Sequence, residues 1–228
     1  MILVLAMAVT LAILRPFGVT LLDIPLRPRP ITVDFYRELG RIAQEGGLHE
    51  AARYNGGTYV YSFNISGRGR VPNLQILVEH SPLVIVGTIQ AGELRERPSA
   101  FIDTLYSVRV SETVKGDARS VVEVRVPGGR LTFRDGTVAE VQTPGFALRV
   151  GGTYVFFLQP ASVGVGTVPT DATERVKMLG AGHASVVDVS TGRTQAFALP
   201  NDPIRTQLHN RDANGFLNEI RALAHRGR

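Results

Sequence analysis

A regular alternation of apolar and polar residues over Ile102–Val114 constrains the fold of this chain most strongly. The even positions of this stretch are mainly apolar and the odd positions are mainly polar. Successive side chains of a β-strand point to opposite faces, so the pattern predicts a strand with one face in a core and one in water. Valines at alternate positions over Val122–Val126 repeat the pattern after the glycine turn Lys115–Asp117. We therefore predict that the two strands form an antiparallel pair.

Other strands are predicted around this pair. Leu83–Ile89 is apolar along its length, which is typical of a strand buried on both faces. Asp135-Gly136 separates two alternating runs and predicts a hairpin turn, and Thr191-Gly192 predicts the turn of a second hairpin within Ala184–Leu199. Thr153–Leu158 follows two glycines and reads as an aromatic core strand. Two further β-stretches are predicted at Thr58–Ser66 and Val176–Gly182.

Amphipathic helical periodicity occurs before and after the stretch that contains these strands. Val33–Arg53 carries apolar residues at i, i+4 and i+7, and Gly46-Gly47 interrupts the pattern, so we predict an amphipathic helix with a break. A short helix is predicted at Pro72–Glu79. A second amphipathic helix is predicted over Asp212–Arg226, with Asp212 as its N-cap. The predicted class is therefore mainly β (α+β).

The chain begins with an apolar run, Met1–Leu14, that has no charged side chain. As a helix the run would be about 21 Å long, short of the roughly 30 Å hydrocarbon core of a bilayer. Arg15 and Pro16 follow it at once, while its length suits the apolar part of a signal peptide. We expect a signal that is cleaved poorly and acts as an anchor, or part of a longer signal, with membrane contact through residues 1–22. The alternative is a buried helix of a soluble domain.

Five short motifs together resemble a known group of proteins. They are S-x-L-V-x-V-G-T at Ser81–Thr88, Y-S-V-R-V-S-E-T-V-K-G-D at Tyr106–Asp117, V-P-G-G at Val126–Gly129, P-G-F at Pro144–Phe146 and G-x-x-Y-V-F-F-L at Gly151–Leu158. In this order they resemble bacterial exported proteins whose shared domain is similar to the TIMP/netrin-like branch of the OB fold. The resemblance implies an OB-like antiparallel β-barrel, and most of these proteins have no assigned activity. The inhibitory mechanism of the metalloprotease inhibitors with this fold is not implied, because it needs an N-terminal cysteine and this chain has no cysteine.

With the resemblance, the segments combine into one predicted organisation. We expect an OB-like β-barrel with an N-terminal apolar helix, an amphipathic helix before the barrel and a C-terminal helix. The predicted parts are residues 1–25 as a signal or membrane-anchor segment, 26–32 as a Pro/Arg linker, 33–71 as a helical and extended lead-in, 72–200 as the OB-like β-barrel domain and 201–228 as a C-terminal helix with a basic tail.

The composition excludes several kinds of chemistry. The 228 residues include no cysteine, which excludes disulfides, Cys-ligated zinc, iron–sulfur clusters and thiol catalysis. The net charge is +5, and the basic residues, almost all arginines, are scattered along the chain. Binding to a phosphate backbone normally uses a clustered basic face, so nucleic acid is not the expected partner. An oligonucleotide-binding OB domain is the weakest of the alternatives.

No motif points to a metal, a cofactor or a catalytic residue. His49-Glu50-Ala51-Ala52-Arg53 begins like the zincin motif, but Arg53 stands where the second imidazole is required. The enzymatic alternative is a hydrolase-type site assembled from dispersed residues, which needs a pocket that holds a histidine against a carboxylate. Its candidate residues are His183, Asp188, Asp103 and Glu112.

The preferred prediction is a non-enzymatic binding module, exported or tethered to the membrane. We expect it to be extracytoplasmic, either secreted or membrane-anchored, and its partner to be a protein or an envelope polymer at the cell surface. Loops and exposed faces of a rigid scaffold carry most recognition. The predicted binding surface is therefore the outer face of the barrel around Arg109, Ser111 and Arg125, or the hairpin loop Gly128–Thr143 with Arg130 and Arg134.

Overall fold

The structure is a computed structural model that describes the larger part of the chain. The described residues are 33–62, 71–97, 101–143, 148–160, 176–179, 182–198 and 202–226. The predicted signal or anchor segment 1–25, the membrane contact through residues 1–22 and the linker 26–32 all lie outside the described residues. The chain divides into two compact units, Met1–Gly40 and Arg41–Arg228. The first unit contributes the start of helix α2, and everything described below belongs to the second unit unless stated otherwise.

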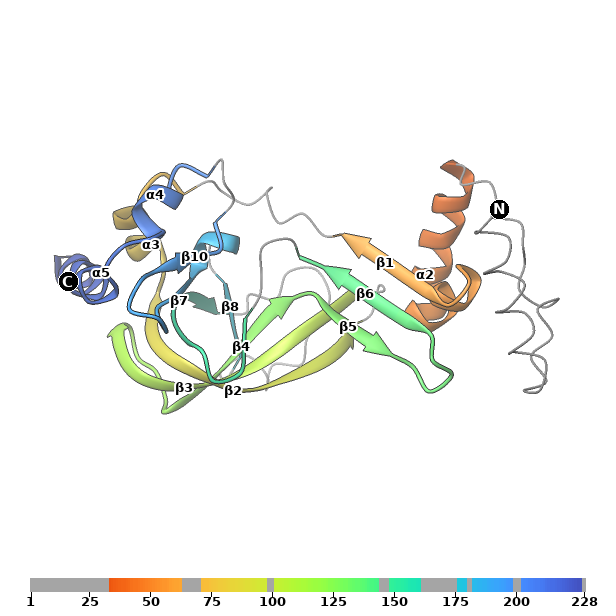
Figure 1. The fold of residues 1–228 in the computed structure, drawn as a ribbon, viewed down its shortest axis with the longest axis horizontal. Coiled ribbons are helices and arrows are strands. Elements are labelled where there is room, and N and C mark those ends of the chain that lie inside the picture. The colour runs from red at the N-terminus through yellow and green to blue at the C-terminus, as the bar shows by residue number, and fades with distance from the viewer. Residues whose placement is uncertain are drawn as a thin grey trace, which may run out of the picture. The chain divides into compact units, whose positions relative to one another are not determined.

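The second unit is mainly β, as predicted, with strands making up 43% of the described residues and helices 32%. Its larger sheet has seven strands (Figure 1). In spatial order they are β10 (Gln195–Ala196), β9 (Val186–Asp188), β7 (Thr153–Pro160), β2 (Leu83–Arg97), β3 (Phe101–Lys115), β4 (Val121–Pro127) and β8 (Val176–Leu179). Strand β8 lies parallel to β4 and also pairs antiparallel with β7. It therefore lies between these two strands. All other pairs in this sheet are antiparallel.

The predicted antiparallel pair of β3 and β4 is confirmed, with Val108 opposite Val122. The alternation over Ile102–Val114 does not persist along the whole of β3, however. Val86 pairs with Glu112 and Gly87 pairs with Val110, so Ser111 has no partner on β2 and forms a β-bulge. One extra residue reverses the faces beyond it. The prediction that all even positions share one face is therefore wrong after Ser111.

Two hydrophobic clusters lie on opposite faces of β2 and β7, which confirms that Leu83–Ile89 is buried on both faces. One cluster, here called the sheet cluster, contains buried residues of the strands. Its members are Leu83, Ile85, Ile89, Val108, Val122, Val124, Val126, Tyr154, Phe156, Leu158 and Val186. The other, the helix cluster, joins the strands to the helices. Its larger members are Leu74, Leu77, Val84, Val86, Val155, Phe157, Ile204, Leu208, Phe216 and Ile220.

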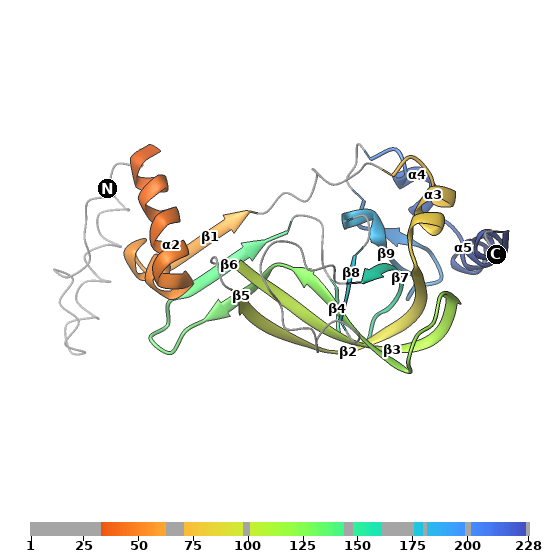
Figure 2. The same cartoon turned by 180° about the vertical axis from the view of Figure 1, so that it is seen from behind.

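Three helices supply the helix cluster. Helix α3 (Leu74–His80) has Asn73 as its N-cap, whose side chain accepts a hydrogen bond from the Ile76 backbone N–H at 2.9 Å. Helix α4 (Arg205–Leu208) is a single turn. Helix α5 (Ala213–Arg226) begins at the predicted cap, because Asp212 accepts a hydrogen bond from the Gly215 N–H at 2.6 Å. Figure 2 shows α3, α4 and α5 together at the same end of the unit. A short 3-10 helix, η4 (Gly182–Ser185), precedes β9.

A second sheet of three strands was not predicted as a unit. Its order is β1 (Thr58–Ser62), β6 (Val138–Gln142) and β5 (Gly129–Thr132). The hairpin of β5 and β6 turns at Asp135-Gly136 as predicted, with Gly136 at a φ of 82°. Strand β1 lies parallel to β6, so a segment of the predicted lead-in 33–71 pairs with a strand of the predicted domain 72–200.

Helix α2 (Val33–Tyr54) covers the segment for which an interrupted helix was predicted. Gly47 has a φ of 85° and a ψ of 175°, a conformation outside the helical region that glycine adopts without strain. Directly after the break, the Leu48 N–H donates a hydrogen bond to the carboxylate of Glu96 on β2 at 3.2 Å. Among the residues that the structure describes, no helix combines the length and the apolar character that a membrane span requires.

Candidate functional site

Two of the predicted binding residues, Arg109 and Arg125, lie on one face of the β3–β4 pair. Arg109 is opposite Val121 and Arg125 is opposite Leu105, and residues that are opposite in a pair share a face. Leu105 and Arg109 are four positions apart on β3, a span of about 13 Å. The two arginines therefore occupy neighbouring but separate positions on this face, here called the β3–β4 face.

Arg109 is a cation of the β3–β4 face that has no ion-pair partner among the described residues. Its side chain is exposed, and it forms no ion pair with any residue that the structure describes. Ser111, two residues further along, is also exposed, but its hydroxyl donates a hydrogen bond to the Val86 carbonyl at 3.0 Å. That bond is made within the bulge, so Ser111 supports the strand pair. The guanidinium group of Arg109 is therefore available to an anionic group outside the protein.

Arg125 is engaged within the protein by Asp103. The Arg125 Nε lies 3.6 Å from the Asp103 carboxylate, and the Arg97 Nε lies 2.7 Å from the same oxygen. Asp103 is only 2% exposed, so the prediction that this odd position of the strand faces water is wrong. Within the described residues neither carboxylate oxygen has a partner in hydrogen-bond geometry. Burial raises the pKa of Asp103, and the two guanidinium groups only partly oppose this effect.

The other two predicted binding residues belong to the three-stranded sheet. Arg130 on β5 lies 3.8 Å from Glu140 on β6, and Arg134 is exposed in the turn between these strands. The structure therefore divides the predicted surface between two sheets. Arg109 and Arg125 lie together on the larger sheet, and Arg130 and Arg134 lie on the hairpin.

Three of the four residues of the predicted hydrolase alternative, Asp103, Glu112 and Asp188, are each paired with different arginines. Glu112 accepts hydrogen bonds from the Arg221 Nε at 2.8 Å and the Arg221 Nη2 at 2.7 Å, which join β3 to α5 and lower the pKa of Glu112. Asp103 and Glu112 are nine positions apart on one strand, about 30 Å. Each carboxylate compensates an arginine. The side chain of His183, the fourth candidate residue, lies outside the described part of the chain.

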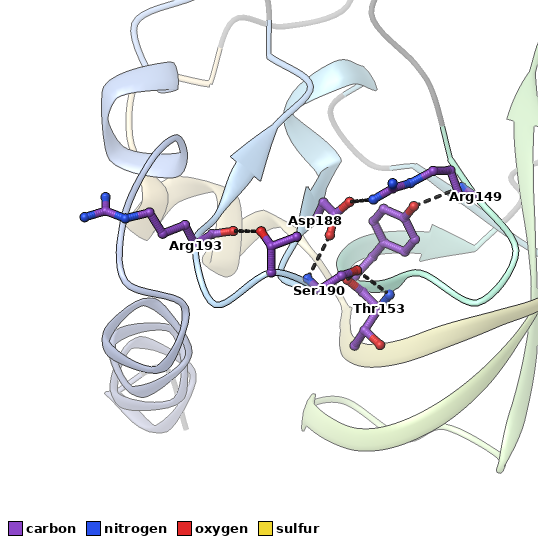
Figure 3. A network of polar contacts seen from close by, with 7 residues as sticks. Arg149, Thr153, Asp188, Ser190 and Arg193 are labelled. Carbon is purple, nitrogen blue, oxygen red and sulfur yellow. Dashed lines mark hydrogen bonds and ion pairs between the residues drawn. The ribbon is translucent and has the colours of Figure 1, made fainter.

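Asp188, the remaining candidate acid, is the centre of a polar network (Figure 3). Its carboxylate accepts a hydrogen bond from the Ser190 N–H at 2.8 Å and one from the Arg149 Nη2 at 3.1 Å. The Arg149 N–H donates in turn to the Tyr154 hydroxyl at 2.9 Å, and the Thr153 N–H donates to the Ser190 hydroxyl at 2.9 Å. Asp188 is 4% exposed, and these bonds tie β7 to the turn after β9. This network stabilises the fold around β7.

One histidine–carboxylate pair was not predicted. The His49 Nε2 lies 2.9 Å from the Asp135 Oδ2, and the His49 ring stacks on Phe133 with the ring centroids 4.4 Å apart. The hydrogen bonds from His49 and Thr137 hold the pKa of Asp135 well below its usual range. His49 and Asp135 are 86 positions apart, so their pairing could not be read from the sequence. In the sequence, His49 stood out only as the first residue of an incomplete zincin motif. The pair joins α2 to the β5–β6 turn.

Within the described residues, no group of three or more His, Cys, Asp or Glu side chains is placed to hold a metal ion. The chain matches no protein-family model and no curated protein sequence.

Proposed function

We propose that the chain is an extracytoplasmic binding module, built on an OB-type β-barrel, that binds an acidic partner through the β3–β4 face. The partner would be an extended acidic segment of a protein or of an envelope polymer.

The order of strand pairing supports an OB-type barrel. An OB fold is a five-stranded Greek-key barrel in which the sequence-ordered strands pair as 1-2-3-5-4-1. Here β2, β3 and β4 pair in succession, β4 pairs in parallel with β8, and β8 pairs with β7, which returns to β2. This order supports the assignment of β2, β3, β4, β7 and β8 as OB strands one to five.

The free charge of Arg109 is the observation on which the proposed ligand rests. OB folds bind extended ligands over the face of their second and third strands, which correspond here to β3 and β4. Arg109 is exposed on this face and lacks an acidic partner among the described residues, whereas Arg125 lies 3.6 Å from the Asp103 carboxylate, which it shares with Arg97. An unpaired guanidinium on a rigid strand favours a carboxylate or phosphate ligand.

The pairing of the candidate acids favours binding over hydrolysis. A general acid or base needs a carboxylate whose proton can be exchanged with a substrate. Glu112 is instead held by two hydrogen bonds from Arg221, and Asp188 by bonds from Arg149 and the Ser190 N–H. Such contacts are typical of carboxylates that stabilise a fold.

The apolar run Met1–Leu14 supports an extracytoplasmic location. Cell fractionation with carbonate extraction, followed by N-terminal sequencing of the product, tests this part of the proposal. Mature protein that begins between Arg15 and Pro30 outside the cytoplasm is expected for a signal, and intact protein in the membrane fraction is expected for an anchor. Intact protein in the cytosol would contradict both.

A binding titration tests the proposed face. Fluorescent poly-L-glutamate serves as the acidic probe, and anisotropy is measured at low ionic strength. Arg109→Glu is expected to weaken binding about three- to tenfold, from the roughly 1 kcal/mol of an exposed ion pair and the added repulsion. Arg134→Glu is the matched control, since it makes the same charge change at an exposed arginine on the other sheet. It should weaken binding less than twofold.

The relative weakening of binding by Arg109→Glu and Arg134→Glu shows which surface holds the probe. Equal weakening by Arg109→Glu and Arg134→Glu would mean that the probe senses only net charge, and the β3–β4 face would lose its support. Greater weakening by Arg134→Glu would move the surface to the β5–β6 hairpin. A single-stranded oligonucleotide of the same charge provides a further arm. If it binds much more tightly than poly-L-glutamate and depends on Arg109, the ligand is a nucleic acid.

A further inference from the structure

Strand β1 is an end strand of the three-stranded sheet, and one of its edges has no strand partner in the described part of the chain. The Val138 N–H donates to the Gly57 carbonyl at 2.9 Å, so the backbone groups of Gly57 point towards β6. Successive residues of a strand direct these groups to opposite edges. The N–H and C=O groups of Thr58, Val60 and Ser62 are therefore directed away from β6. The Thr58 carbonyl accepts a bond from the Asn55 side chain at 2.6 Å and can accept a second one.

The free edge of β1 lacks the devices that normally prevent edge pairing. Such edges are blocked by charged side chains, prolines, bulges or short length. Strand β1 reads Thr-Tyr-Val-Tyr-Ser, with no charge, glycine or proline. Three other free edges in the described part of the chain are blocked. Strand β10 has two residues, β5 carries Arg130, and the part of β2 beyond its pairing with β7 carries four charged residues, Glu93, Arg95, Glu96 and Arg97.

The side chains of β1 are nearly symmetric about Val60. Tyr59 and Tyr61 flank Val60, and Thr58 and Ser62 flank the tyrosines. An antiparallel partner with the same sequence would thus meet a like side chain at every position. Val60 is 50% exposed and Tyr61 is 44% exposed, both high for large apolar side chains in a strand. The edge and its two exposed side chains suit a copy of the same strand.

We propose that two copies of this chain associate through antiparallel pairing of their β1 strands about a two-fold axis at Val60. The N–H and C=O groups of Val60 then bond to those of Val60 in the second copy, and Thr58 pairs with Ser62 on either side. The Val60 side chains cover one another on one face. On the other face, Tyr61 lies opposite Tyr59 of the second copy, and most of this contact falls on Tyr61 because Tyr59 is only 7% exposed. The three-stranded sheets join into one continuous sheet across the interface, which is isologous as two-fold symmetry requires.

The interface is small, so the dimer is expected to be reversible. Stable interfaces bury about 1,200 Å² or more, and five residues of strand bury less than this. We expect a dissociation constant of about 1–100 µM. The proposal does not depend on the β3–β4 face, since β1 belongs to the other sheet.

Cross-linking tests the position of the axis. The chain has no cysteine, so Val60→Cys introduces a single thiol per copy. A hydrogen-bonded antiparallel pair has a Cα–Cα distance of about 5.5 Å, which a disulfide can bridge. At about 50 µM under mild oxidation, most of the full-length Val60→Cys protein should become a covalent dimer. Val121→Cys is the matched control, because Val121 is also a strand valine and is 44% exposed. It should cross-link at least tenfold more slowly, and equal rates would overturn the proposal.

Charge pairing tests the contact between the two Val60 side chains without any covalent bond. Sedimentation is measured for the full-length Val60→Lys and Val60→Glu proteins, separately and mixed. Each variant alone should bind itself at least tenfold more weakly than wild type, because like charges meet at the axis. The equimolar mixture should recover the dimer. A native far-UV circular dichroism spectrum of both variants shows that folding is retained. A dimer that persists in both variants, or a wild-type chain that stays monomeric to about 1 mM, would overturn the proposal.

Discussion

Truncation of Phe157 tests whether helices cover the outer side of the larger sheet. Phe157 lies on β7, is fully buried and belongs to the helix cluster together with Phe216 of α5. Its neighbours Phe156 and Leu158 point to the opposite face and belong to the sheet cluster. The substitution Phe157→Ala therefore removes a side chain from the helix cluster and leaves the side chains of the sheet cluster unchanged.

The expected loss follows from the burial. Burying a phenylalanine side chain contributes about 1.5–3 kcal/mol through removal of apolar surface from water. The cavity left in a close-packed core adds to this, so Phe157→Ala should cost about 3–5 kcal/mol of unfolding free energy. Domains have only about 5–15 kcal/mol in total. With a urea dependence of about 2 kcal/mol/M, the unfolding midpoint should fall by about 2 M.

Urea unfolding followed by circular dichroism measures the loss, with Tyr36→Ala as the control. Tyr36 is 61% exposed, so its truncation should cost less than about 1 kcal/mol. Combining Phe157→Ala with Phe216→Ala tests whether these two members of the helix cluster pack on each other, since truncations at a shared contact are not additive and couple by about 0.5–3 kcal/mol. A loss below about 1.5 kcal/mol together with strict additivity would refute the reasoning, because the helices would then not cover Phe157.

Two further predictions concern the larger sheet. Burial raises the pKa of Asp103 in the folded protein above its ordinary value of 3.8. Protonated Asp103 therefore stabilises the fold fully below pH 3.8, and this stabilisation is lost as the pH rises through the folded-state pKa. Asp103→Asn should flatten this part of the plot of Tm against pH, and parallel plots would contradict it. Gly87→Ala should cost about 1–3 kcal/mol in urea unfolding, because the new Cβ would lie 2.6 Å from a Val108 methyl and 2.8 Å from the Arg109 carbonyl oxygen. Gly92→Ala should cost less, since the Cβ there would meet a tyrosine ring at 3.0 Å, and an equal cost would contradict the argument.

Features that depend on neighbouring residues could be predicted from the sequence. The apolar run Leu83–Ile89 predicts burial on both faces because successive side chains of a strand point to opposite faces and all of these are apolar or small. Asp135-Gly136 and Thr191-Gly192 predict their turns because glycine adopts a positive φ readily, 82° at Gly136 and 77° at Gly192. Asp212 predicts the start of α5 because its side chain caps a backbone group three residues later.

Features that depend on distant residues could not be predicted in this way. Asp103 follows the polar half of the alternation, but Arg97 and Arg125 on neighbouring strands bury it. The bulge at Ser111 changes no residue type and becomes visible only when the partner strand is known. The same holds for the candidate surface. Arg109 and Arg125 are both arginines in alternating strands, and only the location of Asp103 distinguishes the free one from the paired one.

The parallel pairing of β1 with β6 has a consequence during synthesis of the chain. Thr58 pairs with Val138, so 80 residues must be added after β1 begins before its partner strand starts to emerge. Throughout that interval both edges of an uncharged, aromatic and β-branched segment are open. Short segments of this composition are prone to form intermolecular sheets while they are exposed. The nascent chain is therefore most vulnerable to aggregation before β6 is made, and a slower ribosome between these two strands lengthens that exposure.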